Sequence, residues 1–297
     1  MPALSRQYAK LCDARDFEDP ELLDAVRSLV PERDPLLHVE RKVWEFAMVA
    51  LFLDEVGRLD RDTEVLSVGA GSERILFWLA QRVGRVVATD LYGEGSFAER
   101  EAGRAMLEDP RSESPWRYPE ERLEVMWMDA RELAFADESF DCVITVSSIE
   151  HFGSPADTRR AAREIGRVLR PGGHAAIVTD LLVRRHPLDS ALVDLAVRLA
   201  TMGRRRGVAT LRRRARVEAF SRRELQRQVV EPSGLTSLQP LDTSLSDKSW
   251  ENLTRQTKEG LIPRTGAHYP HLLVQVGRSV HTSVCLALEK PRGSRHP

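Results

Sequence analysis

The chain has 297 residues, of which 42% are hydrophobic and 30% charged, and its net charge is −1. This composition is that of a folded globular protein and excludes a fibrous or disordered chain, and the length allows one large α/β domain or two smaller ones. Cys12, Cys142 and Cys285 are far apart and belong to no Cys/His cluster. We therefore expect no disulfide framework, no bound metal and a reducing, cytoplasmic location.

The first 60 residues predict two helices. One begins at Pro20 and shows helical spacing of apolar residues as far as Leu29, and a second runs from Val43 to a break near Gly57. The first 16 residues carry charges throughout and lack the apolar region of a secretory signal. No run of about 18 apolar residues occurs, so we expect no membrane span.

From Glu64 onward, short apolar runs alternate with helical stretches. The predicted strands lie at 65–68, 86–89, 123–128, 142–147 and 174–179, and the predicted helices at 75–83 and 157–169. This alternation is typical of βαβ units around a parallel sheet, whose ligands bind at the carboxyl ends of the strands.

Beyond residue 180 the alternation is interrupted by Leu181–Ala219, which we interpret as a helical insertion covering the sheet as a lid. Between Arg204 and Arg227 there are ten arginines against two acids. Ser221-Arg-Arg-Glu224 has the pattern of a capping box that opens another helix. Strands at 235–241 and 282–288 are then expected to complete the sheet.

A glycine loop follows the first predicted parallel strand. Val68 leads into Gly69, Ala70 and Gly71, and a helix begins soon afterwards. Glycines allow a tight turn and close approach of a ligand, and the helix N-terminus offers N–H groups. Because G-x-G also occurs in ordinary turns, this pattern needs a second signal.

Asp90 supplies the second signal, because it ends the next strand nineteen residues after Gly71. An acid there is placed to bind ribose hydroxyls, although it could also cap the following helix. Glycine loop and acid together favour a nucleoside site. A dinucleotide fingerprint requires a third glycine where this chain has Arg74. S-adenosylmethionine, which has a ribose and an adenine but no phosphate, tolerates that departure better.

Residues 64–180 resemble the class I methyltransferases, and more narrowly the type 11 methyltransferase domain. Beside the glycine loop and Asp90, the resemblance rests on the order and spacing of four motifs, Met128-Asp129-Ala130-Arg-Glu-Leu133, Asp137-Glu-Ser-Phe140-Asp141, Ser147-Ser-Ile-Glu-His151 and Glu164-Ile-Gly-Arg-Val-Leu-Arg170-Pro171-Gly172-Gly173. It implies a methyltransferase that uses S-adenosyl-L-methionine. The implied α/β fold is a Rossmann-like three-layer sandwich with a mostly parallel seven-stranded sheet, an antiparallel last strand, N-terminal helices and a helical insertion.

The resemblance also implies roles for the glycine loop and for the residues at the end of the next strand. Gly69, Ala70 and Gly71 are expected to lie against the methionine part of the cofactor. Asp90 is expected to hold the ribose and Leu91 to pack on the adenine.

In the motif that begins at Met128, Asp129 is expected to accept a hydrogen bond from the adenine amino group, with the Ala130 N–H near the ring. Ser147 and Ser148 are expected to face the sulfonium and the methyl acceptor. Two departures concern the loop: Ser67 replaces the family's usual acid, and Glu73 replaces a third glycine. Glu73 could compensate near the ammonium group of the cofactor.

His151 is the first candidate for a catalytic base, because a hydroxyl acceptor must lose its proton as it attacks the methyl group. Glu150 is the second candidate. In the alternative interpretation, His151 makes a hydrogen bond within a loop and Glu150 is a solvated carboxylate.

Several acceptors are disfavoured. The Ser147-Ser-Ile-Glu150 segment is unlike the Asn/Asp-Pro-Pro motif of DNA amino-methyltransferases, and Cys142 lies inside a strand, unlike the nucleophile of cytosine methyltransferases. No carboxylate cluster for metal-dependent catechol methylation is evident. The arginine run could attract an anionic acceptor, an anionic membrane surface or RNA, or be a solvated face. Its lack of aromatic residues disfavours single-stranded nucleic acid.

The leading hypothesis is O-methylation of a small hydroxylated metabolite, such as a sugar or glycan intermediate. The alternatives are N- or C-methylation of a small, quinone-like metabolite, and a cofactor-binding protein without turnover. His186 and the His268-Tyr-Pro-His271 segment are candidates for the acceptor pocket. We divide the chain into a helical cap (1–60), a cofactor-binding core (61–180), the arginine-rich insertion (181–219) and the completion of the sheet (220–297). The sequence does not predict the oligomeric state.

Overall fold

The computed structural model describes residues 4–36, 39–94, 101–184, 199, 218–257, 260–263, 271–277 and 279–292. Within these residues, eleven strands form one sheet. Its main path runs in the order β4 (Leu123–Trp127), β3 (Arg85–Asp90), β2 (Glu64–Val68), β5 (Phe140–Val146), β6 (Leu169–Arg184), β11 (Ser279–Glu289), β10 (Leu273–Val276), β8 (Leu253–Thr257) and β9 (Gly260–Pro263). The short strands β1 (Lys10–Leu11) and β7 (Thr236–Ser237) pair with β11.

The pairing confirms the predicted fold class. Strands β4, β3, β2, β5 and β6 are parallel, and β11 runs antiparallel to β6. The sheet is larger than the predicted seven strands, because β10, β8 and β9 continue it beyond β11.

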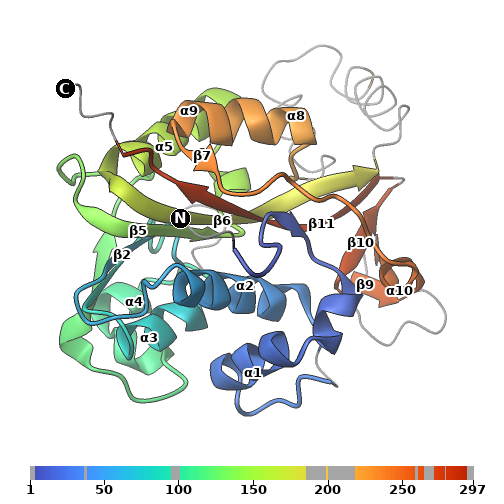
Figure 1. The fold of residues 1–297 in the computed structure, drawn as a ribbon, viewed down its shortest axis with the longest axis horizontal. Helices are drawn as coiled ribbons and strands as arrows, with labels where there is room; N and C mark the ends of the chain where they lie inside the picture. Colours follow the sequence, from blue (N-terminus) through green and yellow to red (C-terminus); the bar gives the residue numbers. More distant parts are fainter. Residues whose placement is uncertain are drawn as a thin grey trace.

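Helices cover both faces of the sheet, as Figure 1 shows. One face carries α5 (Pro155–Val168), α8 (Arg222–Leu225) and α9 (Glu231–Ser233). The other carries α1 (Pro20–Leu29), α2 (Arg41–Glu55), α3 (Arg74–Ala80) and α4 (Ala105–Glu108). A π-helical turn (Gln226–Val230) joins α8 to α9, and α10 (Asp247–Glu251) lies near β10. Short 3-10 helices occupy Ala14–Glu18, Pro110–Glu113, Glu120–Arg122 and Ile149–His151.

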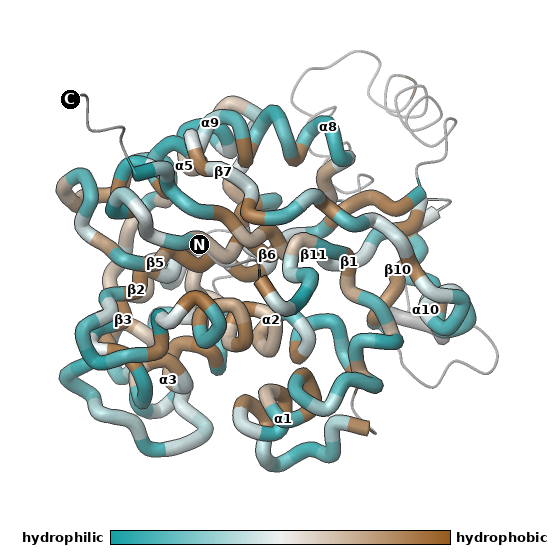
Figure 2. Tube along the Cα trace, viewed as in Figure 1, coloured by the Kyte–Doolittle hydropathy of each residue, from teal (hydrophilic) through white to brown (hydrophobic). Residues whose placement is uncertain are grey.

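The core forms two apolar layers, one on each side of the sheet. Successive side chains of a strand point to opposite faces: Cys142 and Ile144 of β5 belong to the layer under α1, α2 and α3, whereas Val143 belongs to the layer under α5. Figure 2 shows apolar residues concentrated along the central strands. Because α2 packs against both the sheet and α1, every residue from Val43 to Ala50 is buried, including the charged Glu45.

Local capping explains where the main helices begin. Asp19 accepts a hydrogen bond from the Glu21 N–H at the start of α1, and Pro20 occupies the first turn. The predicted capping box of Ser221 and Glu224 is confirmed at the start of α8.

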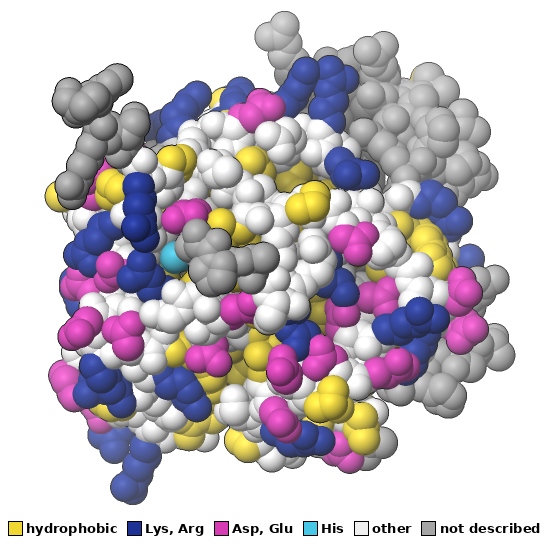
Figure 3. Space-filling model, in the orientation of Figure 1, with side chains coloured by type: hydrophobic (Ala, Val, Ile, Leu, Met, Phe, Trp, Pro, Cys, Tyr) yellow, Lys and Arg dark blue, Asp and Glu magenta, His cyan; other side chains and the backbone are white. Residues whose placement is uncertain are grey.

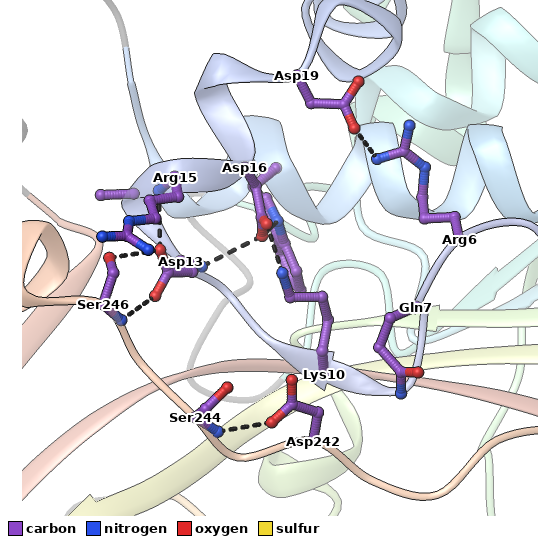
Figure 4. A network of polar contacts seen from close by, with 12 residues as sticks. Arg6, Gln7, Lys10, Asp13, Arg15, Asp16, Asp19, Asp242, Ser244 and Ser246 are labelled. Atoms are coloured by element: carbon purple, nitrogen blue, oxygen red, sulfur yellow. Dashed lines mark hydrogen bonds and ion pairs between the residues drawn. The ribbon is translucent and has the colours of Figure 1, made fainter.

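A polar network fastens the N-terminal segment to the chain that leads into α10, as Figure 4 shows. Asp13 accepts hydrogen bonds from the Ser246 hydroxyl, at 2.6 Å, and from the Arg15 N–H, at 2.8 Å. Lys10 pairs with Asp16, and Arg6 pairs with Asp19. Segments more than 200 residues apart in the sequence are thereby held together beside β11.

Two predictions about the second half of the chain need correction or stay open. The strand expected at 235–241 is reduced to the two residues of β7, because only Thr236 and Ser237 pair with β11. Most of the 181–219 insertion lies outside the described residues, as do His186 and His268. Three arginines of the run are exposed: Arg222 and Arg223 on α8, and Arg227 on the π-helical turn that follows it. On the face in Figure 3, acidic and basic side chains are interspersed.

Candidate active site

A cavity of about 460 Å³ opens where the parallel strands end, between α2 and the loops that follow β2, β3, β4 and β5. This volume lies in the range of small-molecule sites. The structure brings seven of the eight predicted cofactor-binding residues together on its wall: Gly69, Gly71, Asp90, Leu91, Asp129, Ala130 and Ser147. The eighth, Ala70, is buried behind the loop, and its N–H donates to the Thr89 carbonyl at 3.0 Å.

The glycine loop takes a left-handed backbone that brings it against its neighbours. Gly69 has a φ of +66°, and a Cβ atom there would lie 2.6 Å from the Cβ of Ser148. Gly71 has a φ of +50°, and its carbonyl accepts a hydrogen bond from the buried Tyr92 hydroxyl at 2.9 Å. Asp90 and Tyr92 thus bind the N–H and the carbonyl of Gly71 and hold the loop in this conformation.

Asp90 lies on the cavity wall. Its carboxylate accepts hydrogen bonds from the Gly71 N–H at 2.8 Å and the Leu91 N–H at 2.7 Å. Burial raises the pKa of Asp90, and these two hydrogen bonds oppose the rise. A carboxylate has about four lone-pair positions, so the two backbone groups leave acceptor capacity for the hydroxyls of a ribose.

One part of the wall, the apolar wall, is suited to a flat, weakly polar ring. Leu91, Met128 and Ala130 supply apolar surface there, and Asp129 supplies a carboxylate. Arg131 donates from Nε to Asp129 Oδ1 at 2.8 Å. This guanidinium holds the pKa of Asp129 below its ordinary value, so Asp129 stays an acceptor.

Another part of the wall, the charged wall, carries ionic side chains. It is formed by Arg41, Lys42 and Glu45 of α2 and by Glu73 of the glycine loop. Sequence reasoning missed the α2 residues as site residues. A signal was available, because Glu45 interrupts an otherwise apolar helix segment and a buried charge needs partners.

Ser147 and Ser148 follow β5 and line the same cavity. Ser147 has a φ of +49°, unusual for a residue with a side chain. Its N–H donates to the Val178 carbonyl at 2.9 Å, and its hydroxyl donates to Glu45 at 2.8 Å. Backbone strain of this kind is characteristic of functional sites. The Ser148 hydroxyl donates to the Gly69 carbonyl at 2.6 Å.

His151 lines the cavity close to these serines. Its Nδ1 lies 2.6 Å from Oε2 of Glu218, which precedes α8. Sequence reasoning did not identify Glu218, because 67 residues separate it from His151 and no local pattern marks the pair.

Glu150, the second candidate base, is not among the residues that line the cavity. It accepts a hydrogen bond from the Thr179 hydroxyl at 2.6 Å. Burial and the nearby Asp180 raise the pKa of Glu150 well above its ordinary value.

The donor set fits S-adenosylmethionine in three respects. Asp90 suits the ribose, the apolar wall suits the adenine, and the charged wall suits an amino acid. Six acids and three lysine or arginine side chains line the cavity, and this excess of negative charge favours a cationic ligand.

The described residues include no group of three or more His, Cys, Asp or Glu placed to hold a metal. No helix among them is long and apolar enough to cross a membrane.

Comparison with known proteins agrees with this geometry. Residues 66–177 match the family model described as a methyltransferase domain. This segment is a class I S-adenosylmethionine-dependent methyltransferase domain. The methyltransferase domain uses S-adenosylmethionine as its cofactor, which confirms the prediction from the sequence. The roles of the individual residues in binding the cofactor stay predictions.

Curated relatives match part of this chain. The methyltransferase GfsG of Streptomyces halstedii is 35% identical over 121 residues, 41% of this chain and 38% of that protein. A phosphatidylethanolamine N-methyltransferase of Cereibacter sphaeroides is 32% identical over 143 residues, 48% of this chain and 63% of that protein. The chain thus spans less than two thirds of these relatives. The YcgJ protein of Bacillus subtilis is similar in structure with a TM-score of 0.46 and 17% identity, covering 82% of this chain and 98% of that one.

Proposed function

We propose that this protein transfers the methyl group of S-adenosylmethionine to a hydroxyl group of a small hydroxylated metabolite, such as a sugar or glycan intermediate. The observation that carries the proposal is the contact between His151, which lines the cavity, and the Glu218 carboxylate, 2.6 Å from its Nδ1. A histidine held by a carboxylate at one ring nitrogen is the arrangement of a general base.

The cofactor, the cavity wall, His151 and Glu218 have separate roles in the proposed methyl transfer. Bound S-adenosylmethionine supplies an electrophilic methyl group on a sulfonium. The cavity wall holds the acceptor in line, and alignment supplies much of the acceleration of such a displacement. His151 takes the proton that the acceptor hydroxyl loses as it attacks. Glu218 fixes the orientation of the imidazole and stabilises the imidazolium that forms.

A second candidate is methylation of an amine. The observation that favours it is the excess of acidic side chains on the cavity wall, six against three lysine or arginine side chains. A cationic ammonium group would be attracted to these carboxylates. The phosphatidylethanolamine N-methyltransferase relative acts on an amine. The exposed arginines of α8 would favour an acceptor that also carries a negative charge.

The first experiment identifies the acceptor. The protein is incubated with S-adenosylmethionine labelled on its methyl group and fractionated cell extract, and labelled products are identified by mass spectrometry. A methyl ether supports the proposal, and a methylated amine supports the second candidate. Cofactor binding without a labelled product in any fraction would indicate a binding protein without turnover.

The second experiment tests the base with the identified acceptor. His151→Ala is expected to lower kcat by about 100-fold or more, since general-base catalysis contributes about 10²- to 10⁴-fold. Glu218→Gln removes the charge that stabilises the imidazolium. In this variant, the rise of activity with pH should therefore occur at lower pH than in the wild-type protein. Glu231→Gln, an exposed carboxyl change on α9, is the matched control. Full activity of His151→Ala would exclude base catalysis by His151.

A further inference from the structure

Lys42 is the centre of the charged wall. Its Nζ atom lies 2.7 Å from Oε1 of Glu73 and 3.3 Å from Oε2 of Glu45. Glu73 belongs to the matched methyltransferase segment, but Lys42 and Glu45 belong to α2, which precedes it. Helix α2 therefore completes the wall of a cavity whose other parts come from the sheet.

The three charges differ in how open they are. Only 1% of the Glu45 side chain is exposed, against 21% for Glu73 and 40% for Lys42. Glu45 is also bound by the hydroxyls of Ser147 and Ser283, so it is a fixed anchor inside the protein. Lys42 and Glu73 form an ion pair that faces the cavity.

The charge states of Lys42 and Glu73 would allow each to exchange the other for an oppositely charged group of a ligand. Burial alone would lower the pKa of Lys42, but Glu45 and Glu73 outweigh it and the pKa lies above its ordinary value. Lys42 therefore stays cationic near neutral pH. Burial raises the pKa of Glu73, and Lys42 opposes this rise. An ammonium group has three donors, of which Glu45 and Glu73 take two.

The remaining lining residues show which part of the cofactor would meet the pair. With the ribose at Asp90 and the base on Leu91 and Ala130, the charged wall remains for the amino-acid end. That end carries one carboxylate and one ammonium group, and the charged wall offers the Lys42 ammonium and the Glu73 carboxylate. The other cation of this wall, Arg41, is paired with Asp180 at 2.7 Å.

We infer that Lys42 binds the α-carboxylate of S-adenosylmethionine while Glu73 binds its α-ammonium group, so that the cofactor replaces their mutual ion pair. Lys42 is thus a specificity-determining residue for the amino-acid end, held in place by Glu45. This inference rests on the cofactor site of the proposed function but not on the identity of the acceptor.

Calorimetry with three ligands tests the inference: S-adenosylmethionine, its decarboxylated analogue, and 5′-methylthioadenosine, which lacks the whole amino-acid end. The wild-type protein should bind S-adenosylmethionine best. Lys42→Met should weaken its binding about 10- to 100-fold, the usual effect of losing a charge-assisted hydrogen bond. The same change should leave 5′-methylthioadenosine binding within about twofold. Glu73→Gln should weaken both ligands that carry the ammonium group.

Controls separate this result from misfolding. Retained 5′-methylthioadenosine binding shows that the variant is folded, and Lys42→Arg should recover most of the lost affinity. Lys248→Met removes a comparable ion pair, with Glu18 at 2.8 Å, outside the cavity and should change no affinity. Equal weakening of all three ligands by Lys42→Met, or no weakening, overturns the inference. Because no acceptor is present, failure to find a methylated product leaves this result standing.

Discussion

Replacement of Asp90 by Asn is expected to weaken binding of S-adenosylmethionine about 10- to 100-fold. In the structure, one carboxylate oxygen accepts from the Gly71 N–H at 2.8 Å and the other from the Leu91 N–H at 2.7 Å. The amide of Asn keeps only one oxygen, so one of these N–H groups must face an NH2 group. An unsatisfied buried donor costs about 1–3 kcal/mol, and this cost should appear as lower stability.

The effect on affinity comes from the ribose. Hydrogen bonds to a charged group contribute roughly 1.5–3 kcal/mol, and 1.4 kcal/mol corresponds to about tenfold in Kd. Loss of the charge should therefore remove one to two orders of magnitude. Calorimetry at pH 7 gives Kd, and thermal unfolding of the free protein gives the stability cost separately.

Asp141→Asn is the matched control. The Asp141 carboxylate also accepts a backbone hydrogen bond, from the Glu64 N–H at 3.0 Å, and it pairs with Arg170 at 2.7 Å. It does not line the cavity. This variant should lose stability and keep its Kd. An unchanged Kd in Asp90→Asn, or equal weakening in both variants, would refute the ribose assignment.

Two further predictions concern the loop and the buried acid. Gly69→Ala should lower both the Tm and the cofactor affinity, because its Cβ would lie 2.6 Å from the Cβ of Ser148; Gly57→Ala has a similar φ of +68° with no neighbour within 4 Å and should lower only the Tm. Glu150 has a raised pKa, so its neutral form stabilises the fold below the ordinary carboxyl pKa of 4.5 and that contribution is lost as pH rises. Denaturant unfolding should show that Glu150→Gln stabilises the protein more at pH 8 than at pH 5, and an equal change at both values would contradict the burial of this group.

The parallel half of the fold could be predicted because its signals are local. β2 and β3 are short apolar runs that end in Gly69 and Asp90, and these residue types have meaning at the end of a parallel strand. The capping box at Ser221 is likewise complete within four residues. Such patterns involve residues close together in the sequence, so they can be recognised without knowledge of the tertiary contacts.

The additional strands could not be predicted in the same way. β8, β9 and β10 have four or five residues each, too few for a clear alternation of apolar and polar side chains. β10 pairs in parallel with β8 and antiparallel with β11. Pairing with strands distant in the sequence stabilises them, and tertiary context of this kind overrides local propensity.

The site was predicted on its cofactor side and missed on its α2 side for a related reason. Glu218 meets His151, and Lys42 meets Glu73, only after the sheet has brought separate segments together. Spacing within a helix does not reveal which of its charged residues will face a cavity. The position of Glu45 among apolar neighbours was the one local sign that α2 contributes to the site as well as to the packing of the core.

The decisive measurement is a crystal structure of the wild-type protein with S-adenosylhomocysteine, which shares the ribose, the adenine and the amino-acid end of the cofactor. The ribose hydroxyls are expected within hydrogen-bonding distance of Asp90, the adenine against Leu91, and the α-carboxylate at Lys42. Electron density for the ligand outside this cavity, or inside it with the adenine at Lys42, would contradict the assignment of the site.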